Sequence, residues 1–118
     1  MSAAAKSVYY FGFYLYAIGI GLIFIPNLFL KTFQLPETNE VWIRVVGILV
    51  FLIGFYYHQT GKLNFIAFYP LTVIARTVVF ISFIFFVALK FTSPMLIGFG
   101  VVDLLGAAWT YMALKKEK

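Results

Sequence analysis

Residues 65–89 read FIAFYPLTVIARTVVFISFIFFVAL, and this apolar stretch is the clearest indication of the fold. Arg76, near its midpoint, is the only charged residue between Lys62 and Lys90. A helix crosses the hydrocarbon core of a bilayer with about 20 mostly apolar residues. We therefore predict that this stretch is a transmembrane helix that carries one charge inside the membrane.

The composition of the whole chain agrees with that prediction. Hydrophobic residues make up 64% of the 118 positions and charged residues only 11%, whereas about 25% of the residues of an ordinary soluble domain are charged. Four spans with short connections use nearly all of this length. We expect an all-α integral membrane protein: residues 1–118 form a single transmembrane domain, a four-helix bundle with up-down topology that resides in the lipid bilayer.

Prolines, glycines and a capping serine predict where the spans begin and end. Pro26 predicts a kink or the end of the first span, and Pro36 suits the first turn of the second helix. Gly61 is typical of a helix stop, and Ser93 with Pro94 suits the cap and first position of the fourth helix. The expected spans are about 8–28, 38–58, 67–89 and 94–114.

The lysines predict the orientation of the bundle. Four spans place both termini on one side, and most lysines fall on that side: Lys6, Lys62, Lys115, Lys116 and Lys118, against Lys31 and Lys90 on the other. Cytoplasmic loops carry an excess of positive charge. We expect both termini to be cytoplasmic, in the inner membrane of a bacterium. The net charge of +5 then reflects topology, and no nucleic-acid partner is expected.

Arg76 and Asp103 are the two charges that need an explanation. Asp103 is the only charged residue between Lys90 and Lys115. A charge at mid-bilayer costs at least about 2.5 kcal/mol and normally faces a protein interior. The third and fourth spans should be antiparallel neighbours, because a short loop joins them. We expect Arg76 and Asp103 to lie at similar depth and to meet.

Tyr16 and Arg44 fall near the same level of the membrane, so we predict a ligand-binding cluster of Tyr16, Arg44, Arg76 and Asp103. Two arginines against one aspartate favour a partner with an anionic or carbonyl group, such as a lipid headgroup, a quinone oxygen or a carboxylate. One alternative is a purely structural Arg76–Asp103 ion pair. Another is that Arg44 pairs with Glu40 and extends to the interface.

Three of the four spans carry a face with glycine at helical spacing. Small residues let transmembrane helices approach closely, so these faces are predicted to pack inside the bundle. The faces are Gly12, Tyr16, Gly19, Ile23 and Pro26; Arg44, Gly47, Phe51, Gly54 and His58; and Gly100, Asp103, Gly106, Ala107 and Thr110.

Several kinds of chemistry have no residues to support them. The chain has no cysteine and one histidine, His58, so no metal site is expected. His58 lies in a polar turn, where it could also relay protons. Paired catalytic carboxylates, phosphate-binding glycine loops and nucleophile motifs are absent from the sequence, which disfavours an enzyme acting alone. No particular cofactor is indicated.

The segment Trp42-Ile43-Arg44-Val45-Val46-Gly47 opens the second span, and an acidic residue lies in a later one. With four short spans, this pattern resembles the DoxX-like group of small four-helix membrane proteins over nearly the whole chain. That group includes subunits associated with quinone-linked oxidation. The resemblance implies the same fold and assigns no catalytic residue here.

The leading hypothesis is a small membrane protein that binds a lipid, a quinone or another small amphipathic molecule at the Arg/Asp cluster, as an accessory to a larger membrane complex. A first alternative is a transporter or channel that functions as a homo-oligomer, with Arg76 and Asp103 on the solute path. A second is an assembly protein whose glycine faces dock a larger membrane complex.

Overall fold

The structure is a computed structural model in which residues 1–116 are described, and it is all-helical. Four of its helices are long and apolar enough to cross a membrane, so the predicted four-helix membrane architecture is confirmed. The elements are α1 (Ala3–Phe24), α2 (Pro26–Thr32), α3 (Trp42–Lys62), the 3-10 turn η1 (Ile66–Phe68), α4 (Tyr69–Ala88) and α5 (Met95–Lys116).

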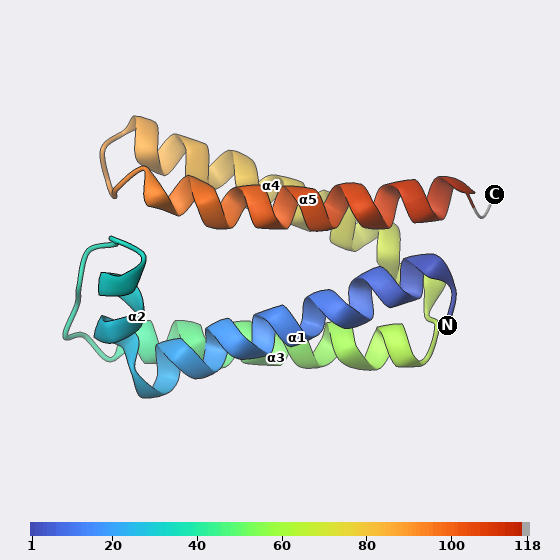
Figure 1. Ribbon diagram of the computed structural model, residues 1–118, viewed down its shortest axis with the longest axis horizontal. Helices are drawn as coiled ribbons and strands as arrows, with labels where there is room; N and C mark the ends of the chain where they lie inside the picture. Colours follow the sequence, from blue (N-terminus) through green and yellow to red (C-terminus); the bar gives the residue numbers. More distant parts are fainter. Residues whose placement is uncertain (117–118) are drawn as a thin grey trace.

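The long helices form two antiparallel pairs, α1 with α3 and α4 with α5 (Figure 1). The pairs approach each other through α1 and α5, near the end of the molecule that holds both chain ends, and they diverge toward α2. Within residues 1–116, α3 and α4 share no extended interface. The bundle is therefore better described as two tightly packed helix pairs with a smaller contact between them than as four equivalent helices.

The α1–α3 contact is a seam of small residues, which we define as Ala5, Gly12 and Gly19 of α1 with Gly47, Gly54 and Gly61 of α3. A Cβ atom added at Gly12 would lie 2.8 Å from the Gly54 carbonyl oxygen, and one at Gly61 would lie 2.9 Å from that of Ala5. Such distances leave no room for a side chain. The members recur every seven residues, and the predicted packing of the glycine faces of α1 and α3 is confirmed.

The buried core lies at the end where the pairs meet. It consists of Ala4, Ala5, Val8, Phe11, Tyr57, Tyr69 and Ala113. Elsewhere the helices present large apolar side chains outward: on α4, Leu71 is 61% exposed and Ile74 62%. A soluble protein would bury such a surface, whereas lipid solvates it.

Two predicted helix starts are wrong. Pro36 does not open the second long helix, which begins at Trp42. The segment before it is tied back to α2, because the Thr38 N–H donates to Asn27 Oδ1 at 2.9 Å. Nor do Ser93 and Pro94 cap and open α5, which begins at Met95. The Ser93 hydroxyl instead donates to the Gln34 carbonyl at 2.8 Å and links the two loops at this end. Pro26 follows a break at Ile25, as predicted.

Three helices end on residues other than glycine in the left-handed conformation. Gln34, Asn64 and Lys90 have φ of 57°, 54° and 63°. After α3, the Asn64 N–H donates to the Gly61 carbonyl and the Phe65 N–H to that of Thr60, which is a Schellman turn. The predicted stop at Gly61 is wrong, because that glycine lies inside the last turn of α3 and packs against α1.

Candidate functional site between the two helix pairs

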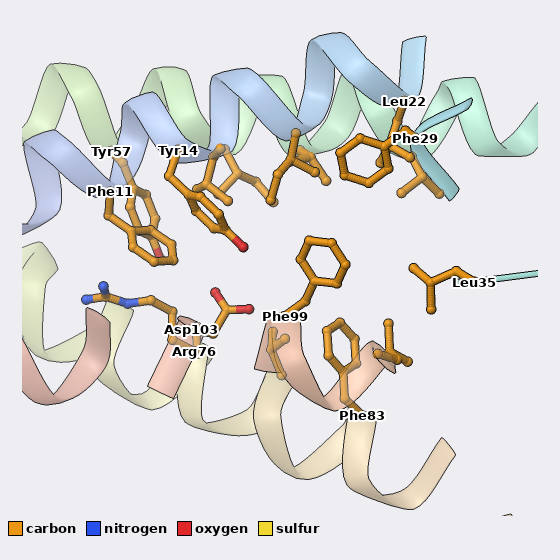
Figure 2. A pocket seen from close by; sticks show the side chains of 18 of the residues that line it. Phe11, Tyr14, Leu22, Phe29, Leu35, Tyr57, Arg76, Phe83, Phe99 and Asp103 are labelled. Carbon is orange, nitrogen blue, oxygen red and sulfur yellow. The ribbon is translucent and has the colours of Figure 1, made fainter. Parts of the chain in front are cut away.

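The space between the diverging pairs is a cleft of about 450 Å³ (Figure 2). Apolar side chains from α1, α2, α3, α4 and α5 form most of its wall, among them Leu22, Phe29, Val50, Val79 and Phe99. The polar side chains on the wall are Tyr14, Tyr57, Arg76 and Asp103. All four belong to one part of the cleft, toward the end where the pairs meet. The cleft is therefore apolar along most of its length and polar at one end.

Arg76 is fixed at that end and only 2% exposed. Its Nε donates to the Thr72 carbonyl at 3.2 Å, and its Nη2 donates to the hydroxyls of Thr72 and Thr110 at 2.9 and 2.8 Å. Its Cζ lies 4.8 Å from the ring centre of Phe11 and 5.5 Å from that of Tyr57. The guanidinium thus contacts all four long helices and stacks against two aromatic faces.

Hydrogen bonds continue from Arg76 into the core. Thr110 Oγ1 lies 2.6 Å from Ser7 Oγ, which donates to the Ala4 carbonyl at 2.7 Å. Thr72 Oγ1 donates to the Tyr69 carbonyl at 2.8 Å. This buried network joins α1, α4 and α5, so it holds the two pairs together at one end of the cleft.

Asp103 does not form a contact ion pair with Arg76. The guanidinium nitrogens bind threonine oxygens, and Nη1 is buried without a hydrogen-bond partner within residues 1–116. In Figure 2 the guanidinium extends beneath the Phe11 ring, while the Asp103 carboxylate points into the cleft and the Tyr14 hydroxyl points toward it. Arg76 and Asp103 still attract each other electrostatically. The two residues thus lie in one site, as expected, but the direct contact between them that was predicted from the sequence is not formed.

Arg44 lies elsewhere. It is exposed at the start of α3, and its Nη1 donates to the Ile23 carbonyl. The break at Ile25 interrupts the hydrogen-bond ladder between α1 and α2, and Arg44 supplies a donor there. Arg44 lines a separate pocket of about 240 Å³ that includes Asn27 and Glu40. It is not among the residues that line the cleft.

Tyr16 also lies outside the cleft. Its hydroxyl is 3.0 Å from His58 Nδ1, and its ring centre is 4.7 Å from that of Phe51. The predicted cluster of four is thus not assembled: the structure brings Arg76 and Asp103 together and leaves Tyr16 and Arg44 apart. Tyr16 lies on a face of α1 that points away from the cleft, because residues predicted at one depth in the membrane can lie on different faces of a helix.

Several residues of the site were not predicted from the sequence, chiefly Tyr14, Phe11, Thr72 and Ser7. Tyr14 is two residues from Tyr16, on the opposite face of α1. Thr72 could have been found, because it precedes Arg76 by four residues and shares its face. Ser7 carried no pattern of its own.

The far end of the cleft is bridged by aromatic rings. Phe99 of α5 lies 6.0 Å from Phe29 of α2 and 4.9 Å from Phe33, measured between ring centres. Together with the hydrogen bond from Ser93 to Gln34, these contacts join the two pairs where they are farthest apart. The two pairs are therefore in contact at both ends of the cleft.

Comparisons with known proteins add no assignment. No protein-family model, curated protein or solved structure matches this chain. The resemblance to the DoxX-like group stays a prediction.

Proposed function

We propose that this integral membrane protein binds an amphipathic molecule of the bilayer, of the lipid or quinone class, in the cleft between its two helix pairs. The observation that carries the proposal is a cleft of about 450 Å³ with an apolar wall and a half-buried carboxylate at one end. Small-molecule sites have volumes of about 300–1,000 Å³ and combine a mostly apolar wall with a few polar groups.

The way in favours a molecule that arrives from the membrane. Both ends of the cleft are bridged, by the Arg76 network at one end and the Phe99 contacts at the other. The helices α3 and α4 both contribute to the wall, yet they share no extended interface within residues 1–116. An acyl or isoprenoid chain could enter sideways between them.

The polar end of the cleft indicates that the ligand is amphipathic. Arg76 and Asp103 place opposite charges beside an apolar space, where polar groups without hydrogen-bond partners are costly. A ligand that brings one polar group to Asp103 and an apolar body to the rest of the cleft satisfies both environments. We further propose that the termini face the cytoplasm, from the lysine distribution.

The test is to fill the cleft without touching its polar end. Ala75 lines the cleft on α4, so we expect Ala75→Phe to displace the bound molecule. Ala17, exposed on α1 and not among the lining residues, gives a matched control in Ala17→Phe. Native mass spectrometry of each protein, extracted gently from its own membrane, reports what remains bound. Equal retention of the same molecule by both variants would contradict the proposal.

A further inference from the structure

The polar end of the cleft presents the two charged side chains unequally. Arg76 is 2% exposed, and its Nε and Nη2 already donate to Thr72 and Thr110. Its remaining nitrogen, Nη1, is buried near Gly106, where an added Cβ would lie 3.0 Å from it. A ligand in the cleft therefore does not meet the guanidinium directly.

Asp103 and Tyr14 are the groups that a ligand would meet. The Asp103 carboxylate is half-buried and points into the cleft, and the Tyr14 hydroxyl points toward it (Figure 2). A carboxylate only accepts hydrogen bonds, whereas a phenol can donate or accept. The polar end thus offers a strong acceptor beside an adaptable hydroxyl.

The sum of charge restricts the ligand further. Among the residues that line the cleft, Arg76 contributes +1 and Asp103 contributes −1, so the polar end is neutral as a whole. An anionic headgroup would meet the Asp103 carboxylate first and would be repelled. A cationic headgroup would pair with Asp103 but would leave a net positive charge in a medium of low dielectric, which is costly.

We propose that the cleft selects neutral amphiphiles that carry a hydroxyl group. The ligand hydroxyl donates to an Asp103 carboxylate oxygen and accepts from the Tyr14 hydroxyl, and Arg76 balances the charge of Asp103 from behind. This inference rests on the proposed function and adds the chemistry of the headgroup. It also reverses the expectation from the sequence, in which two arginines against one aspartate favour a partner with an anionic or carbonyl group.

The experiment compares four amphiphiles with the same 14-carbon chain. They are tetradecan-1-ol, its methyl ether, tetradecanoate and tetradecylammonium, each titrated into the purified protein in mild detergent and followed by native mass spectrometry. Hydrogen bonds to charged groups predict that the alcohol binds roughly 10- to 100-fold more tightly than the ether. The two ionic probes should bind more weakly than the alcohol.

Asp103→Asn is the decisive variant. It keeps the shape of the side chain, and of the described residues that line the cleft only Arg76 then carries a charge. We expect the alcohol to lose roughly tenfold in affinity, because a neutral acceptor replaces a charged one, and tetradecanoate to gain affinity until it outranks the alcohol. Tyr14→Phe removes the hydroxyl that donates to the ligand oxygen, and both the alcohol and the ether offer that oxygen as an acceptor. It should therefore weaken both probes and leave the preference for the alcohol over the ether, which depends on Asp103. Unchanged affinity for the alcohol in Tyr14→Phe would overturn the inference if Asp103→Asn does not fold.

The outcomes separate this inference from the proposed function. If the wild-type protein binds all four amphiphiles equally, or prefers an ionic one, the headgroup inference is overturned while the cleft still binds chains. If none binds, and Ala75→Phe retains the same native molecules as Ala17→Phe, the proposed function itself fails. An unchanged ranking in Asp103→Asn would also overturn the inference.

Discussion

The seam between α1 and α3 and the contact between the two helix pairs are built on opposite principles. In the seam, backbone touches backbone: glycines on each helix face carbonyl oxygens of the other with no room for a Cβ. Between the pairs, long side chains meet at two ends, through Arg76 at one and Phe99 at the other, and a cleft remains between them.

This contrast explains where the molecule has room for a ligand. In lipid, helices associate through close packing and hydrogen bonds, because burial of apolar surface gives little driving force there. The seam uses close packing, and its glycines leave no room for a side chain. The contact between the pairs relies on localised polar and aromatic contacts, which allow the helices to stand apart elsewhere.

The largest effect should come from breaking the seam with Gly54→Val. A Cβ at Gly54 would lie 2.9 Å from the Gly12 carbonyl oxygen, and backbone cannot move aside as a side chain can. We expect a loss of about 3 kcal/mol or more in the free energy of unfolding. Unfolding by SDS in mixed micelles, followed by far-ultraviolet circular dichroism, measures it. Gly98→Val is the matched control, since a Cβ added there would meet no atom of another helix or loop of residues 1–116 within 4 Å, and equal losses in both variants would refute the seam.

A smaller loss is expected from Arg76→Gln, which weakens the contact between the pairs and spares the seam. It removes hydrogen bonds to Thr72 and Thr110, each worth about 0.6 to 1.7 kcal/mol in a membrane protein, so the expected loss is about 2 kcal/mol. The same SDS titration applies. The double variant Arg76→Gln/Asp103→Asn should lose less free energy of unfolding than the sum of the two single losses. The reason is that Asp103→Asn removes a negative charge that no longer has Arg76 to balance it. Strict additivity would show that the two charges are not coupled.

The smallest effect should come from Arg44→Lys at the edge of the seam. Lysine keeps the charge but cannot reproduce the reach and fork of the guanidinium that binds the Ile23 carbonyl. We expect a loss of about 1 kcal/mol, the scale of one hydrogen bond in a membrane protein, with no change in what the cleft retains. Loss of the bound ligand on this substitution would contradict the prediction and would show that Arg44 belongs to the binding site.

The fold was largely predictable from the sequence because hydrophobic length alone defines spans in a bilayer. The glycine faces were predictable too, since spacing along one helix determines which residues share a face. The loops were harder. Pro36 favours a helix start, but the side chain of Asn27, eleven residues from Thr38, binds the backbone there. Such a contact leaves no local pattern.

The candidate site was predictable in part. Arg76 and Asp103 were identified because isolated charges in apolar stretches are rare. Tyr14 was not, because depth in the membrane does not distinguish it from Tyr16, and the choice of face depends on how α1 packs against both α3 and α5. The absence of a direct Arg76–Asp103 bond could not be foreseen either. The direct bond is absent because the guanidinium instead donates to the hydroxyls of Thr72 and Thr110.

The position of the seam has a consequence for how the protein is made. All six of its residues fall within positions 5–61, so the ribosome has synthesised the seam before it reaches Arg76. Domains that emerge first generally fold first. We expect α1 and α3 to pair in the membrane before α4 inserts. The rings of Phe11 and Tyr57 would then already be in place to contact Arg76. Arg76 would then pack against these two rings as α4 inserts, so its charge would not be exposed to lipid without a protein partner.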